Sequence, residues 1–180
     1  QGTDFASVIS GSGAVTQAGS GTTVLAGANT YTGTTTVSAG ILSISGSINS
    51  SLALAVNGGT LSTTGANKLA NTAAVTVAGG TLTVGGADTV GTLVMSSGTI
   101  GGTQTLTATT YALSGGTVTG NLGTGTLNSS GTVALNGTSA ATVVNVTAGT
   151  LTLGSADRLT NTTTVAVSGT GILNMSTFID

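Results

Sequence analysis

Few side chains in this sequence can carry chemistry. The 180 residues include no His and no Cys, and the charged side chains are those of Asp4, Asp88, Asp157, Asp180, Lys68 and Arg158. Nucleophilic catalysis through a Ser-His-Asp or Cys-His arrangement requires an imidazole, and a thiolate metal site requires Cys. The residue types therefore predict a protein that is not an enzyme and that binds no cofactor and no metal.

The composition also limits the kinds of partner. Charged residues make up 3% of the chain and the formal net charge is −2, whereas an average soluble protein has about 25% charged residues. Two cations are too few to neutralise a track of phosphates, so we expect no nucleic-acid binding. The mean hydropathy of +0.48 does not fit a disordered chain, which combines low hydrophobicity with high net charge.

The elements that carry these residues are built from a repeat. A Gly-x-aliphatic unit recurs about every 19 residues, at 40–42, 59–61, 80–82, 98–100, 116–118, 131–133, 149–151 and 171–173. A longer period also exists, because residues 59–79 are similar to residues 149–169. Repetition on this scale is typical of stacked supersecondary units.

Each repeat has the pattern of β-strands. Segments 36–39, 42–45, 75–77, 82–84 and 151–153 alternate apolar and hydroxyl side chains with a period of two. A single repeat has only about four or five large aliphatic side chains, too few to close a core alone. We therefore predict an all-β solenoid, a single segment over residues 1–180 with about nine turns, and a length of about 40–45 Å at about 4.8 Å per turn.

This fold leaves little room for paired carboxylates. Asp88 and Asp157 are 69 residues apart, nearly four turns, so we expect at least about 15 Å between them, which exceeds the spacing of glycosidase carboxylates. Polysaccharide lyases on parallel β-helices are the enzymatic alternative by fold analogy. They need several acids for Ca²⁺ and a basic catalyst, and we interpret the acids here as solvated surface charges instead.

The N-terminal part carries a more specific signal. Residues 5–46 include Gly-Ala-Asn-Thr-Tyr-Thr-Gly at 27–33, followed by Thr-Thr-Val-Ser-Ala-Gly at 35–40. This stretch resembles the autotransporter-associated β-strand repeat of bacterial passenger domains. The resemblance implies a right-handed parallel β-helix, an extracellular location on the bacterial cell surface, and tethering to an outer-membrane barrel that we expect outside this chain.

The motif residues have structural interpretations. We expect Gly27 and Gly33 to turn corners, Asn29 to stack or hydrogen-bond within a turn, and Tyr31 to be a packing or surface aromatic rather than a sugar platform. The glycines of later repeat units complete the predicted structural motif: Gly40, Gly59, Gly80 and Gly149.

The function predicted from these features is an adhesive or structural stalk that contacts a host or matrix surface. The first alternative is a subunit of an extracellular fibre or biofilm filament that self-associates end to end or laterally, because the open ends of a solenoid offer unpaired strand edges. A second alternative is ice binding, which needs Thr-x-Thr in register on successive turns. Only some turns have that form, such as 81–83 and 150–152.

Overall fold

A computed structural model describes residues 3–175, in which sixteen strands form one sheet and no helix occurs. No segment of that range could therefore cross a membrane as a helix. The strands are β1 (Thr3–Phe5), β2 (Val15–Gln17), β3 (Thr22–Leu25), β4 (Thr35–Val37), β5 (Ile41–Ile44), β6 (Ala53–Val56), β7 (Thr60–Thr63), β8 (Ala74–Val84), β9 (Asp88–Gly102), β10 (Thr105–Val118), β11 (Asn121–Leu122), β12 (Thr126–Leu135), β13 (Val143–Val146), β14 (Thr150–Leu153), β15 (Thr164–Val167) and β16 (Ile172–Asn174).

The chain winds as a coil in which each strand pairs in parallel with strands of the neighbouring turns. What we call the first sheet contains β2, β4, β6, β13, β15, the first parts of β8 and β12, and the middle parts of β9 and β10. The second sheet contains β1, β3, β5, β7, β14, β16 and the last parts of β8, β9, β10 and β12. The prediction of a right-handed parallel β-helix is thereby confirmed.

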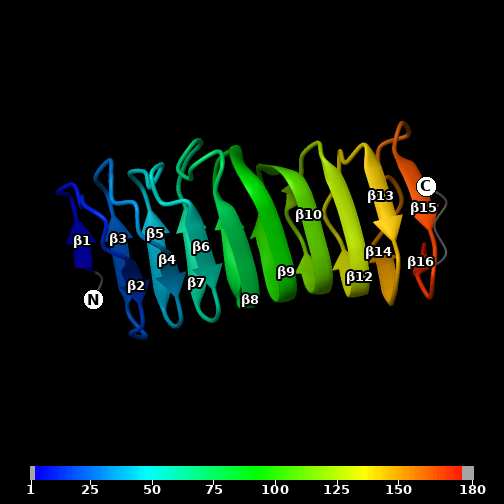
Figure 1. Cartoon of the computed structure of the whole chain (residues 1–180), viewed down its shortest axis with the longest axis horizontal. Helices are drawn as coiled ribbons and strands as arrows, with labels where there is room; N and C mark the ends of the chain where they lie inside the picture. Colours follow the sequence, from blue (N-terminus) through cyan, green and yellow to red (C-terminus); the bar gives the residue numbers. More distant parts are fainter. Residues whose placement is uncertain (1–2, 176–180) are drawn as a thin grey trace.

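A third side of the coil is held by much shorter pairings. Single bridges join Ala28 to Ser47, Ile48 to Leu69, and Ser139 to Leu122 and Leu159. In the middle of the stack, ladders of two or three residues join the first parts of β9 and β10 and join β10 to β11. Here the chain leaves the second sheet and returns to the first, so this third side closes each turn (Figure 1).

The core consists of aliphatic side chains stacked in register. In the second sheet one set of inward positions forms an uninterrupted column, in which every side chain is at most 1% exposed: Leu42, Leu61, Leu82, Ile100, Val118, Leu135 and Leu153. Six steps of this column cover 111 residues, a mean of 18.5 per turn. The structure has about ten turns, close to the predicted nine.

Polar residues interrupt one inward column of the first sheet at Gln17 and Ser129. Ser129 lies between Leu113 and Val146 in this column and is fully buried. Its hydroxyl has no hydrogen-bond partner within residues 3–175. A buried hydroxyl without a partner costs about 1–3 kcal/mol.

Replacing Ser129 by Ala is therefore expected to raise the free energy of unfolding by about 1 kcal/mol or more, because the change removes the unpaired hydroxyl with little change in volume. Urea unfolding followed by circular dichroism measures the difference. Ser62→Ala, an outward and half-buried site, is the matched control and should change stability little. A loss of stability in Ser129→Ala would show that the hydroxyl is satisfied in solution.

Strand length changes along the molecule. β8, β9, β10 and β12 have 11, 15, 14 and 10 residues, and each bends from the first sheet into the second without a break. Towards both ends each sheet is formed by separate strands of three or four residues. β1 and β16 lie at opposite ends of the stack (Figure 1).

Candidate functional site

The repeat motif builds a polar connection between three turns. Asn29 is 2% exposed. Its Oδ1 accepts a hydrogen bond from the Ile9 amide at 2.9 Å, and its Nδ2 donates to the carbonyl oxygens of Gly27 at 2.8 Å and Ser47 at 3.2 Å. Because Ile9 and Ser47 belong to the turns on either side, this carboxamide ties neighbouring turns together as well as bonding within its own turn.

Tyr31 begins a buried chain of hydroxyl groups. The side chain is 1% exposed, and its hydroxyl lies 2.6 Å from Oγ1 of Thr35, which lies 2.8 Å from Oγ of Ser51. Ser51 then donates to the carbonyl oxygen of Gly33 at 2.9 Å. Burial raises the pKa of Tyr31 against the opposing effect of these hydrogen bonds, so the phenol stays neutral. The ring lies in the interior and offers no platform for a sugar.

Tyr111 is also inside the coil. It is fully buried, and its hydroxyl accepts a hydrogen bond from the Ala108 amide at 2.9 Å and lies 3.0 Å from the carbonyl oxygen of Leu106, to which it can donate. Burial raises the pKa of this phenol too. Both tyrosines therefore act as core side chains whose polar ends are satisfied, as buried tyrosines require.

The predicted structural glycines have two physical roles. Gly40, Gly59 and Gly149 have φ of +61°, +61° and +66°, a region that side chains with a Cβ avoid. Gly27, Gly33 and Gly80 lie outside that region but against neighbouring turns: a Cβ on Gly27 would lie 2.8 Å from the carbonyl oxygen of Ser7, and one on Gly80 would lie 2.9 Å from that of Gly58. A Cβ on Gly33 would overlap the Gly13 backbone. Close stacking of turns, more than turn conformation, requires glycine at these last three positions.

The interpretation of all acids as solvated surface charges is wrong for Asp88. This side chain is 2% exposed on the third side of the coil, where it pairs with Leu106. Its oxygens accept hydrogen bonds from the amides of Lys68 at 2.9 Å, Leu69 at 3.3 Å and Thr89 at 3.1 Å. Asp88 thus makes the same kind of contact with the preceding turn that Asn29 makes.

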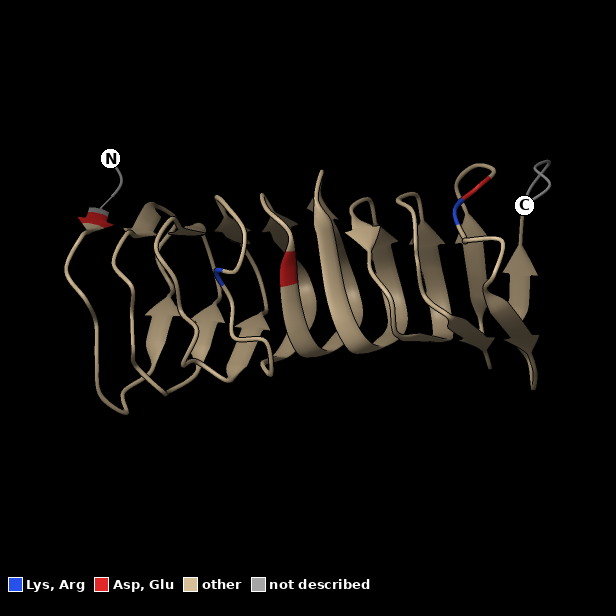
Figure 2. Cartoon of the chain, turned by 90° about the horizontal axis from the view of Figure 1, so that it is seen from above, with Lys and Arg blue, Asp and Glu red and all other residues tan. Residues whose placement is uncertain are grey.

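The other charged residues do not converge on a site. Asp157 is exposed, and Arg158 donates to the carbonyl oxygens of Asn136 at 2.8 Å and Ala156 at 3.2 Å. Asp4 lies on β1, and Asp180 lies outside the described residues. Figure 2 shows the acidic and basic positions of the described residues spread along the molecule, apart from one adjacent pair, which corresponds to the sequence neighbours Asp157 and Arg158. In the range 3–175 no three potential metal ligands come together.

Sequence reasoning missed Asp88, although a signal was present. Gly-Ala-Asn at 27–29 and Gly-Ala-Asp at 86–88 are the same motif with an Asx residue at the end. The motif alone does not decide whether its final Asx side chain is buried, because Gly-Ala-Asn at 65–67 ends in an exposed Asn67 with φ of +54°. Asp157, 90 residues further on, has φ of +55° and is likewise exposed.

The pH dependence of stability reports on Asp88. Burial raises the pKa of this carboxyl above its usual value, so the folded state holds the proton more tightly than the unfolded state. The contribution of Asp88 is therefore fully present below the usual Asp pKa of about 3.9 and decreases as the pH rises through the higher pKa of the folded state. We expect the wild type to lose stability over this pH window, measured as the midpoint of thermal unfolding, relative to Asp88→Asn, which cannot titrate.

The exposed Asp157→Asn variant is the matched control and should keep the wild-type profile. Parallel profiles for the wild type and Asp88→Asn would contradict the buried position of the carboxylate.

Parts of this chain are similar to a known repeat family and to a known bacterial protein. The profile of the passenger-associated transport repeat matches residues 15–44, the segment that contains Asn29, Tyr31 and Thr35. A 65-residue stretch is 49% identical to the "Adhesin BmaC autotransporter" of Brucella suis biovar 1 (strain 1330). The prediction of an autotransporter passenger repeat is thereby confirmed for this segment.

Both similarities agree with the prediction of export to the bacterial cell surface. The stretch similar to the Brucella adhesin covers 35% of this chain and 2% of that protein. No solved structure shows significant similarity to this chain.

Proposed function

We propose that this passenger segment is a structural and adhesive stalk, which holds more distal parts of a tethered surface protein away from the cell and itself contacts a host or matrix surface. The observation that supports this proposal is the parallel pairing that connects turns from β1 to β16. Each added turn lengthens such a coil by about 4.8 Å. The similarity to an autotransporter adhesin agrees with an adhesive role.

The charge distribution supports contact through flat faces. Among residues 3–175, the charged side chains Lys68, Asp88, Asp157 and Arg158 lie on or next to the third side, and Asp4 lies on the first strand. The outer faces of the two sheets between residues 15 and 153 carry no charge. Adhesion through these faces would depend on shape and hydrogen bonds, and salt would weaken it little.

Deletion of residues 1–180 from the parent protein on living cells tests the proposal. We expect lower adherence to host cells or matrix at equal surface abundance, and a shorter distance between the cell and a distal epitope. A deletion of similar size in another coiled part serves as the control for length. Unchanged adherence and unchanged epitope distance would overturn the proposal.

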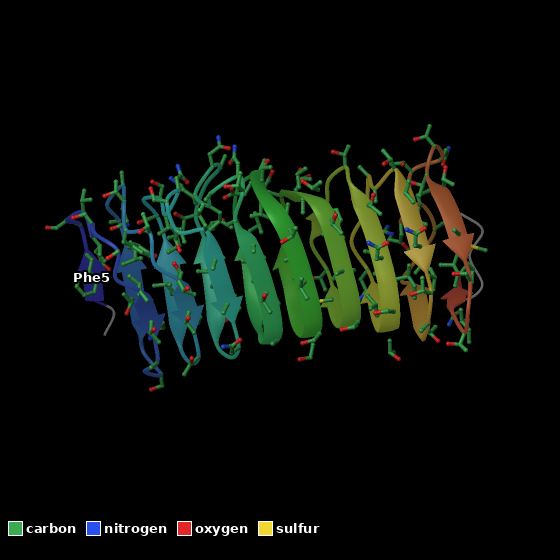
Figure 3. All side chains as sticks on the ribbon, viewed as in Figure 1. Phe5 is labelled. Carbon is green, nitrogen blue, oxygen red and sulfur yellow. The ribbon has the colours of Figure 1, made fainter. Side chains whose placement is uncertain are left out.

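End-to-end assembly of copies into a fibre is the second candidate. Inward-facing side chains become accessible at both ends of the described stack: Phe5 on β1 is 44% exposed (Figure 3), and Val165 and Val167 on β15 are 39% and 50% exposed. Their stacking partners Leu25, Val144 and Val146 are at most 1% exposed. A depression of about 290 Å³ at the β15 end is lined by Leu159, Thr160, Asn161, Thr163, Val165, Leu173 and Met175.

Electron microscopy of the purified chain distinguishes this candidate from an isolated stalk. Rods several times longer than one coil, shortened by Val167→Asp but not by the outward Ala166→Asp, would support fibre assembly. Uniform single rods at high concentration would exclude it.

A further inference from the structure

A row of threonines lies on the outer face of the second sheet. Thr60, Thr81, Thr99 and Thr117 are paired one above the next in four consecutive turns. Each is half-buried, with its side chain on the side opposite the buried column of Leu61, Leu82, Ile100 and Val118. Because neighbouring strands are about 4.8 Å apart, these four hydroxyls repeat at that interval along the axis of the coil. We call them the hydroxyl row.

The hydroxyls of this row are not engaged by the protein. Within the described residues, none of the four makes a side-chain hydrogen bond, whereas Thr35, Thr138 and Thr163 elsewhere in the chain do. A Thr hydroxyl can donate one hydrogen bond and accept two. The row therefore presents a regular series of free donors and acceptors to whatever lies against the sheet.

The residues around the hydroxyl row limit the chemical class of partner that can bind there. Ser62 and Thr83 add hydroxyls beside it, and Thr152 continues its line after Ala134. Described residues on this face between 22 and 152 carry no charge, so a polyanion would find no ion pair here. Large apolar side chains are also scarce, Ile41 being the main exception at 41% exposure, so the face offers little hydrophobic gain to a protein partner.

We propose that the hydroxyl row binds a linear, uncharged polysaccharide that lies along the axis of the β-helix. Such a polymer repeats hydroxyl groups along its length as the row does, and both partners exchange hydrogen bonds without charge. Each contact is weak, and affinity arises from many contacts made at once. The inference rests on the proposed adhesive function and names its ligand class.

Two other occupants fit the face less well. A second copy of the chain would bring hydroxyls against hydroxyls with little apolar area to bury. An ordered ice lattice requires two matched columns of hydroxyls, and the column beside the row is broken where Thr83 pairs with Gly101. The ice-binding alternative accordingly stays a prediction without support from this face.

The test uses the complete 180-residue chain with insoluble cellulose, soluble dextran and the polyanion heparin as probes. We expect binding to at least one of the two neutral polymers, insensitive to salt, and no binding to heparin at physiological salt. The double variant Thr81→Val/Thr99→Val removes two hydroxyls of the row but keeps side-chain size and branching, and should weaken binding at least tenfold. Thr76→Val/Thr92→Val makes the same change on the exposed outer face of the first sheet and should bind as the wild type does.

Three results would overturn the inference: no binding to either neutral polymer, equal binding by the two double variants, or binding that disappears as salt rises. A change in self-association alone, measured by light scattering, would assign the face to a second copy and would also reject the inference. Equal thermal unfolding midpoints establish that both variants are folded. Cells that still adhere while carrying Thr81→Val/Thr99→Val would be consistent with the stalk proposal. Failure of the polysaccharide inference is therefore distinguishable from failure of the proposed stalk function.

Discussion

Replacing Leu82 by Ala is expected to lower the free energy of unfolding by about 2–5 kcal/mol. Leu82 is fully buried and stacks between Leu61 and Ile100 in the column of the second sheet. Ala would leave a void that the turns above and below cannot fill, because their own side chains are fixed in register by backbone pairing. Urea unfolding followed by circular dichroism measures the loss.

The neighbouring residue provides the control for this effect. Thr81 precedes Leu82 in the same strand but points outward and is half-buried. Thr81→Ala should change stability by no more than about 0.5 kcal/mol, as expected for surface sites. Equal losses in the two variants would be incompatible with an inward Leu82 and an outward Thr81, and would overturn the stacking described above.

Replacing Gly86 by Ala is expected to cost about 1–3 kcal/mol, the usual range for overpacking a tight site. A Cβ on this residue would overlap the backbone of Gly65 and Ala66 in the preceding turn, although the conformation of Gly86 itself would accept a side chain. The cost is therefore purely steric and arises between turns. Thermal and urea unfolding should both show the loss.

Gly19 separates this steric effect from the general effect of replacing a glycine. A Cβ on Gly19 would meet no atom within 4 Å, so Gly19→Ala should be neutral or stabilise the chain by up to about 1 kcal/mol through the unfolded state. If Gly86→Ala were as harmless as Gly19→Ala, the turns would not be packed as closely as the structure has them.

Much of the fold was predictable because its signal is local. In segments such as 60–63 and 81–84, apolar and hydroxyl residues alternate, and in a strand this alternation places one set inside and the other outside. In the first five Gly-x-aliphatic units the aliphatic residue, for example Leu61 or Leu82, occupies the buried column of the second sheet. In the last three units it pairs in a second column beside it, formed by Val133, Leu151 and Leu173. The repeat length then required stacking, because one turn cannot enclose its own core.

The third side of the coil was not predictable in the same way. In most turns it has single bridges in place of continuous strands, and only the pairings between β9, β10 and β11 are longer, so little alternation marks it in the sequence. Asn29 and Asp88 are buried there, while Asn67 is exposed with a left-handed backbone, although all three end the same Gly-Ala-Asx motif. Whether the Asx side chain is buried or exposed depends on how the adjacent turn packs against the loop.

The sequence by itself determined the parallel coil, its approximate turn length, the inward and outward faces of its strands, and the absence of His and Cys chemistry. Only the tertiary structure decided that Asp88 is buried, that Asn29 joins three turns, that Ser129 interrupts the first-sheet column, and that four free threonine hydroxyls line up on one face. The physical reason is distance along the chain. Whether a residue in a strand faces inward or outward depends on its immediate neighbours. Its pairing partner, by contrast, lies about one turn away in the sequence. Because turns differ in length, the position of that partner is known only once backbone pairing sets the register.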